Sequence, residues 1–197
     1  AYWLNRQGIT AFVLKYRVPN TPAHITGALE DAQRGISLIR NMAPEYKYDP
    51  RKVGTVGFSF GGNMALQLGV SLHRKYKEID SADKHPWKPN FQMAIYAEGT
   101  GHLLLPNLGK IPPTFLATDV DDQCQPAGLI MMTATMLKQR GADVDLRVYG
   151  PGGRHGYGRC VLYTEFGNWA PVCEWPKRAA EFIMKHTGKR LERHHHN

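Results

Sequence analysis

Two kinds of hydrophobic pattern alternate along the chain, and together they predict its secondary structure. Short apolar runs rich in β-branched residues predict buried strands, and apolar positions three or four residues apart predict helices that pack by one face. The predicted strands lie at residues 9–16, 52–58, 91–97, 114–118 and 144–149. The predicted helices lie at residues 28–42, 61–73, 126–141 and 175–186.

The order of these elements predicts the fold class. Because strands alternate with helices, the chain consists of strand–helix–strand units, whose strands are parallel and covered on both faces. We therefore expect an α/β fold with three α/β/α layers around a mostly parallel sheet. A single domain is expected at residues 1–188, with a surface excursion at 74–90. Residues 189–197 form a tail that resembles the remnant of an affinity tag.

Composition and charge exclude several classes of protein. With 42% hydrophobic and 21% charged residues, the chain is an ordinary globular protein and is neither disordered nor fibrous. Its net charge of +8 would suit an acidic partner, but no block of five basic residues occurs, so we expect no nucleic acid partner. A polyanion-binding module that uses the basic segment 74–88 is the alternative.

Residues 53–72 form a stretch of twenty positions without a charge, which is long enough to cross a bilayer. Five glycines interrupt this stretch, so it is predicted to form a buried strand, a tight turn and a helix. The chain also opens without the pattern of a signal peptide. We therefore expect no membrane partner.

Candidate chemistry follows the second predicted strand, at the sheet edge where parallel α/β proteins gather their functional residues. The sequence there is Gly57-Phe58-Ser59-Phe60-Gly61, a G-x-S-x-G pattern. This pattern holds a nucleophile on a sharp strand-to-helix turn, which favours residues without side chains two positions to either side. We predict Ser59 as the nucleophile and the N–H of Phe60 as an oxyanion donor at the start of the helix.

An acid and a histidine follow two later strands. Residues 118–126 read Thr-Asp-Val-Asp-Asp-Gln-Cys-Gln-Pro and offer three carboxylates that can orient a base; a solvated acidic loop or a calcium site is the alternative. His155 lies in the glycine-rich loop 150–158, where it has no core to pack into. The order serine, acid, histidine is that of the α/β-hydrolase triad.

Over nearly its whole length the sequence resembles the α/β-hydrolase superfamily. Within it, the chain is most similar to small carbohydrate esterases of the acetyl-xylan and feruloyl esterase-like group, which are related to dienelactone hydrolases. The likeness lies in residues 8–17, the serine turn, residues 112–116, residues 148–149 with the loop 153–158, and residues 175–176. Dienelactone hydrolases use a cysteine nucleophile, so Ser59 favours the esterase branch.

The resemblance also selects among the acids. The family pattern H-G-x-x-D-x-x-V-P falls on residues 118–126 and implies Asp122 as the catalytic acid, with Asp121 as the second candidate and Asp119 as the third. This sequence departs from the pattern at Thr118 and Asp119, which replace His-Gly, and Arg154 is inserted ahead of the histidine. These departures concern the pocket more than the triad.

The family also has a strand that ends in a His-Gly-Gly loop, the source of a second oxyanion donor, and nothing of this kind precedes Tyr2. We expect these N-terminal strands to be missing from this sequence and to belong to upstream residues, because a bare sheet edge would tend to aggregate. The alternative is a truncated relative with an impaired site.

The function implied by the resemblance is that of a serine esterase, without cofactor or metal, that hydrolyses short-chain acyl esters on a carbohydrate such as acetylated xylan. The aromatic residues Tyr157, Trp169 and Trp175 either stack on sugars or pack a lid. Another serine hydrolase, such as a peptidase or a lipase-like enzyme, and a hydrolase-fold binding domain without activity are the alternatives.

The three cysteines, Cys124, Cys160 and Cys173, lack the spacing of zinc ligands. Cys160 and Cys173 flank a loop rich in aromatic residues and are expected to form either a disulfide or two unpaired buried thiols. A disulfide indicates a secreted or periplasmic protein, and a cytoplasmic location is the alternative.

Overall fold

The centre of the fold is a four-stranded parallel sheet. The computed structural model describes residues 1–18, 25–98, 110–160 and 170–188. Its strands are β1 (Gly54–Phe58), β2 (Phe91–Ile95), β3 (Thr114–Asp119) and β4 (Val144–Tyr149), and they lie side by side in chain order. All three neighbouring pairs are parallel. Four of the five predicted strands are therefore confirmed.

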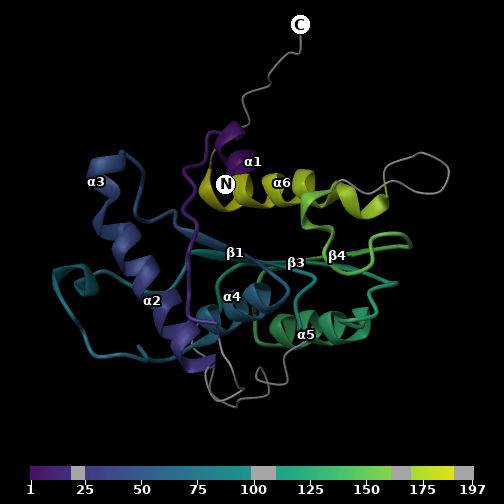
Figure 1. The fold of residues 1–197 in the computed structure, drawn as a ribbon, viewed down its shortest axis with the longest axis horizontal. Helices are drawn as coiled ribbons and strands as arrows, with labels where there is room; N and C mark the ends of the chain where they lie inside the picture. The colour runs from purple at the N-terminus through teal and green to yellow at the C-terminus, as the bar shows by residue number, and fades with distance from the viewer. Residues whose placement is uncertain (19–24, 99–109, 161–169, 189–197) are drawn as a thin grey trace, which may run out of the picture.

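Helices cover both faces of this sheet, as expected for three α/β/α layers. Figure 1 shows α2 (Ile25–Asn41), α4 (Phe60–Val70) and α5 (Ala127–Gln139) on one face, and α6 (Trp175–Thr187) with α1 (Tyr2–Arg6) on the other. The short helix α3 (Ala43–Tyr46) follows α2. Three single-turn 3₁₀ helices complete the described elements, at Ser81–Lys84, Tyr157–Arg159 and Pro171–Glu174.

The two faces of the sheet each carry a hydrophobic core. Every residue of β2 and β3 is buried, which explains why their apolar residues stand at consecutive positions and do not alternate with polar ones. On one face, strand residues pack against Trp175, Phe182 and Ile183 of α6. On the other face, Leu66 of α4 and Leu137 of α5 pack in one cluster with residues of the strands. The apolar face of each helix therefore covers the buried strands.

The predicted strand at residues 9–16 is not a strand in the structure. The segment is extended, and none of the four described strands pairs with it. Phe12 makes edge contacts with the rings of Tyr46 and Tyr48, whereas Val13 is 82% exposed. The prediction was wrong because an apolar, β-branched run encodes burial in a sheet, but a strand exists only where a neighbour completes its hydrogen bonds.

The excursion at residues 74–90 is held against the domain by an ionic cluster. The carboxylate of Asp83 is fully buried and binds Arg74 and Arg34, each at 2.9 Å. Arg34 belongs to α2 and also binds Asp80. Arg74, one of the basic side chains of the segment 74–88 that a polyanion would need, is therefore already neutralised by a carboxylate of the chain.

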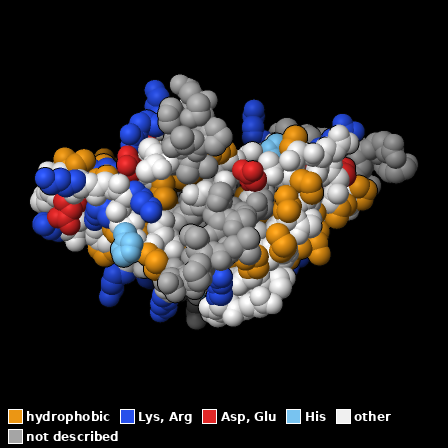
Figure 2. Space-filling model, turned by 90° about the horizontal axis from the view of Figure 1, so that it is seen from below, with side chains coloured by type: hydrophobic (Ala, Val, Ile, Leu, Met, Phe, Trp, Pro, Cys, Tyr) orange, Lys and Arg blue, Asp and Glu red, His pale blue; other side chains and the backbone are white. Residues whose placement is uncertain are grey.

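The uncharged stretch at residues 53–72 forms β1, the turn at Ser59 and α4, as predicted. In the part of the chain that the structure describes, no helix is both long and apolar enough to cross a membrane. Figure 2 shows Lys and Arg side chains scattered over one face of the molecule, and hydrophobic side chains gathered at one end of it. The exposed apolar residues of α5 are Leu129, Met131 and Met132.

Candidate active site

Ser59 lies on the turn between β1 and α4, in a backbone conformation that side chains rarely adopt. Its φ is 53° and its ψ is −121°. Its N–H donates to the carbonyl of Ile95 in β2 at 3.0 Å, and its own carbonyl accepts from the N–H of Asn63 at 3.1 Å. Such a residue carries about 1–3 kcal/mol of strain, which the surrounding strand and helix must hold in place.

The glycines around Ser59 differ in how much space each leaves for a side chain. A Cβ on Gly57 would lie 1.9 Å from the carbonyl oxygen of Gly61, so no side chain fits there. A Cβ on Gly61 meets nothing closer than 3.8 Å, whereas one on Gly62 would lie 2.8 Å from the Cβ of Ala97. The prediction of two obligatory glycines beside the serine is therefore right for Gly57, and Gly62 rather than Gly61 is the second close contact.

His155 connects the serine to the acidic loop. Its Nε2 lies 2.9 Å from the Oγ of Ser59, and its Nδ1 lies 2.8 Å from Oδ2 of Asp122. The sequence separates these residues by 96 and 33 positions, and the carboxyl ends of β1, β3 and β4 bring them together. The three side chains form one hydrogen-bonded row.

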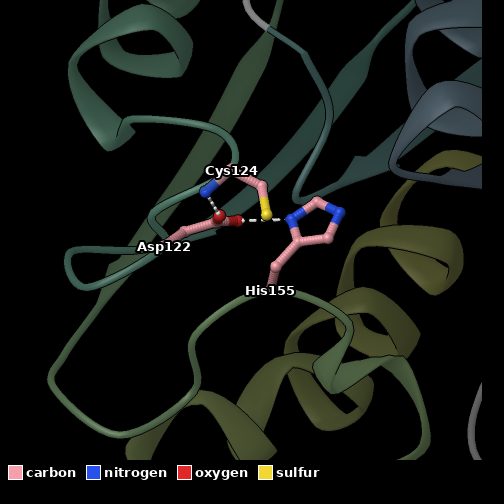
Figure 3. Close-up of side chains that lie close together, drawn as sticks. All are labelled: Asp122, Cys124 and His155. Carbon is pink, nitrogen blue, oxygen red and sulfur yellow. Dashed lines mark hydrogen bonds and ion pairs between the residues drawn. The ribbon is translucent and has the colours of Figure 1, made fainter.

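Asp122 is the acid in this row, in preference to Asp121 and Asp119. Its side chain is fully buried, and Figure 3 shows it directed at His155. Its second oxygen accepts hydrogen bonds from the N–H groups of Cys124 at 2.9 Å and Gln125 at 2.8 Å. These bonds fix the carboxylate, so that one oxygen remains for the imidazole.

Asp119 and Asp121 instead hold the loop that carries the histidine. Asp121 accepts from the N–H groups of Gly152 and Arg154, both at 2.9 Å, and Asp119 accepts from the N–H of Gly153 at 2.9 Å. Three consecutive amides directly before the histidine are thus bound to two carboxylates of the β3 loop. The three acids of this loop are therefore not a solvated surface cluster, because two position the loop and one contacts the imidazole.

The environment of Asp119 and Asp121 sets their protonation. Burial, followed by the neighbouring carboxylate of Asp121, raises the pKa of Asp119 to about 6. The hydrogen bond to Asp119 lowers the pKa of Asp121, and the N–H groups of Arg154 and Gly152 lower it further. Below about pH 6 the pair therefore carries a single negative charge, on Asp121 beside the histidine loop, and above that pH Asp119 ionises as well.

Tyr96 contacts the imidazole of His155, although the sequence pattern did not predict it as a site residue. It follows β2 with a φ of 39°, and its ring lies edge-on to the ring of His155 at 4.9 Å between centroids. The N–H of Gly158 donates to its hydroxyl. No signal in the sequence marked it, because Tyr96 lies inside the strand predicted at residues 91–97, where a tyrosine in an apolar run is ordinarily a core residue.

The N–H of Phe60 is the predicted oxyanion donor. Phe60 is the first residue of α4, where backbone N–H groups have no acceptor within the helix. This position lets the N–H of Phe60 donate a hydrogen bond to an oxyanion that forms beside Ser59. A cavity of about 380 Å³ opens beside this row and is lined by Gln123, Cys124, Arg154 and His155.

Two of the three aromatic residues that were candidates for stacking on sugars are core residues. Tyr157 is 1% exposed and Trp175 is 3% exposed, and both belong to the hydrophobic cluster beneath α6. Neither has a free face for a sugar, so the packing alternative holds for these two. Trp169 lies outside the described residues.

Cys160 and Cys173 do not form a disulfide, which was one of the two alternatives expected for this pair. No disulfide joins the three cysteines, all of which the structure describes, and these two are half-buried with their thiols in hydrogen-bond contact. Burial raises the pKa of Cys160 above its ordinary value. Because the thiolate is the reactive form, a buried protonated thiol resists oxidation, and the alternative of two buried thiols without a disulfide is the one observed.

The parallel sheet, the strained serine turn and the order of the three strand-end residues define the α/β-hydrolase class. Solved structures agree with this class. The α/β hydrolase MGS-M1 from a Medee basin deep-sea metagenome library superposes with a TM-score of 0.73 at 21% identity, over 94% of this chain and 74% of that chain.

The chain belongs to the BD-FAE family, whose family model matches residues 3–103. It is 26% identical to an acetylxylan esterase of Xylanibacter ruminicola over 210 aligned positions, which cover 90% of this chain and 42% of the relative. An acetyl ester-xyloside bifunctional hydrolase from Caldicellulosiruptor lactoaceticus superposes with a TM-score of 0.75 at 29% identity, over 93% of this chain and 74% of that chain. The chain thus spans less than half the length of the curated relative it matches.

Proposed function

We propose that the chain is a serine esterase that removes acetyl groups from xylan-type carbohydrates. The observation that carries the proposal is the hydrogen-bonded row from Ser59 through His155 to Asp122, with distances of 2.9 and 2.8 Å. The names of the acetylxylan esterase and the acetyl ester-xyloside hydrolase support the choice of substrate.

The first half of the reaction forms an acyl-enzyme. The Oγ of Ser59 attacks the ester carbonyl carbon while Nε2 of His155 takes the hydroxyl proton. Asp122 accepts the Nδ1–H of the ring and stabilises the imidazolium that results. The carbonyl oxygen becomes an oxyanion that accepts from the N–H of Phe60. The C–O bond to the sugar then breaks, and His155 returns the proton to the leaving alcohol.

The second half releases the acid. A water molecule gives a proton to Nε2 of His155, and the resulting hydroxide attacks the acyl carbon. The bond to Ser59 then breaks, and the proton returns from His155 to its Oγ. The enzyme regains its starting state, and one ester and one water have become one alcohol and one acid.

The test compares the wild-type chain with a variant that lacks the Ser59 hydroxyl, on several ester substrates. We expect the wild-type chain to release acetate from acetylated xylo-oligosaccharides and from an aryl acetate, with rates that fall as the acyl chain lengthens. Ser59→Ala is expected to lower kcat by at least about 10⁴-fold on both, because the row then lacks its nucleophile. Undiminished hydrolysis by this variant contradicts the mechanism, and a preference for long-chain esters or peptides contradicts the substrate class.

A further inference from the structure

Cys124 places a thiol beside the two groups that activate the serine. The ligand atoms of Asp122, Cys124 and His155 all lie within 4.8 Å of one another. Figure 3 shows the sulfur of Cys124 next to the imidazole and the carboxylate. Neither the esterase mechanism nor the family pattern requires a thiol at this position, so this proximity calls for a separate explanation.

We propose that Asp122, Cys124 and His155 form a binding site for a thiophilic divalent cation such as Zn²⁺, and that the bound ion silences the serine. One carboxylate, one thiolate and one imidazole are the donor types that zinc binds in proteins. Three protein ligands leave a fourth tetrahedral position, which water from the adjoining cavity can fill. Carboxylate and thiolate together offset the two charges of the ion.

The outer partners of the three ligands are already in place. The second oxygen of Asp122 is held by two backbone N–H groups, and Nε2 of His155 is tied to Ser59. Metal sites need such partners to orient their ligands. The thiol belongs to an exposed residue at the cavity wall, which provides the entry path and the freedom to adjust.

The required movement is small. Zinc bonds of about 2.0–2.3 Å place tetrahedral ligand atoms roughly 3.5 Å apart. The oxygen and nitrogen must therefore separate slightly from their 2.8 Å hydrogen bond, and the sulfur must approach both. Because Cys124 is exposed and only two residues from Asp122, a change of its side-chain torsion supplies most of this approach.

The chemical consequence follows from the tautomer of the histidine. An ion on Nδ1 occupies the lone pair of that nitrogen, so the ring proton moves to Nε2, and the thiol proton of Cys124 leaves to solvent. Nε2 then donates to the Oγ of Ser59 and no longer accepts its proton. The silencing rests on the proposed function, whereas binding of the ion does not.

Calorimetry tests binding directly, with ZnCl₂ titrated into the metal-free, reduced full chain. We expect wild type to bind one zinc more than Cys124→Ser, because the tail histidines are present in both proteins. Cys160→Ser is the matched control: it removes a half-buried thiol that is not part of the cluster and should bind zinc like wild type. With Co²⁺, a thiolate charge-transfer absorption is expected in wild type and in the control but not in Cys124→Ser.

Hydrolysis of an aryl acetate tests the silencing. Zinc should inhibit wild type reversibly, and Cys124→Ser should raise the zinc concentration for half-inhibition by at least about 100-fold, since losing a ligand costs no less than losing an outer partner. Equal zinc affinity of wild type and Cys124→Ser overturns the proposed site. A chain that binds zinc through Cys124 but hydrolyses no ester supports the site and contradicts the esterase function instead.

Discussion

At the scale of single residues, the site depends on which of three neighbouring acids faces the imidazole. The residue types and their order along the chain predicted Ser59 and His155, because functional side chains gather at strand ends in parallel α/β folds. The choice of Asp122 needed the resemblance to a family. The contact of Tyr96 and the proximity of Cys124 could not be predicted, because both depend on how separate loops approach in space.

Replacing the acid by its amide tests this assignment. Asp122→Asn keeps an oxygen for the N–H groups of Cys124 and Gln125 but presents an NH₂ to the imidazole, which favours the wrong tautomer. We expect kcat for an aryl acetate to fall by about 10⁴-fold. The matched control is Asp121→Asn, which removes one hydrogen bond to the histidine loop and should cost no more than about tenfold. The reverse ranking of the two variants would show that the acid is misassigned.

At the scale of elements, the segment 150–156 is an irregular loop whose backbone amides are hydrogen-bonded to carboxylates of another loop. Sequence patterns predicted a glycine-rich loop here, but they could not show that Asp119 and Asp121 bind its amides, because such contacts join two separate loops. The same reason explains the wrong prediction at residues 9–16. Local pattern specifies which residues prefer burial, whereas pairing between strands depends on distant parts of the chain.

A Cβ inserted into this loop is expected to move the histidine. On Gly153 it would lie 2.2 Å from Oδ2 of Asp119, so Gly153→Ala must displace the anchor. A misplacement of the imidazole by about 1 Å costs on the order of 100-fold, and we expect kcat to fall by about 10- to 100-fold with KM little changed.

The control for this prediction is Gly128→Ala in α5, where a Cβ meets nothing within 4 Å. This variant should keep wild-type kinetics and gain about 0.5–1 kcal/mol in free energy of unfolding from its better helix propensity. Steady-state kinetics and thermal unfolding of both variants provide the measurement. Wild-type kcat in a folded Gly153→Ala protein would show that the carboxylates do not position the histidine.

At the scale of the whole molecule, the ionic cluster that stabilises the fold and the candidate active site lie in different parts of the structure. The ionic cluster around Asp83 holds the excursion at 74–90 against α2, whereas the candidate active site lies at the carboxyl ends of the strands. Burial alone would raise the pKa of Asp83, but the Tyr76 hydroxyl, the Ile79 N–H and the Arg34 guanidinium hold this pKa well below its usual range. The ionised form of Asp83 therefore stabilises the fold.

Asp83→Asn is expected to lower the free energy of unfolding at pH 7 by about 3 kcal/mol, because two arginines lose their buried partner. The pKa of Asp83 is depressed in the folded state, so its contribution is fully present above the unfolded value of about 4 and is lost gradually as the pH falls from there through the depressed folded-state pKa. In denaturant unfolding, the difference between wild type and variant should therefore be largest at pH 7 and shrink steadily as the pH falls below about 4, with kcat of the folded variant unchanged at pH 7. A difference that grows in acid would contradict this account.

The proposed esterase function requires that Ser59 is an activated nucleophile. Its reaction with a fluorophosphonate probe, followed by mass spectrometry of the digested chain, measures this directly. We expect one adduct on Ser59, formed far faster in wild type than in Asp122→Asn and absent from Ser59→Ala. A folded wild-type chain that acquires no adduct, or acquires it on another residue, would contradict the central claim.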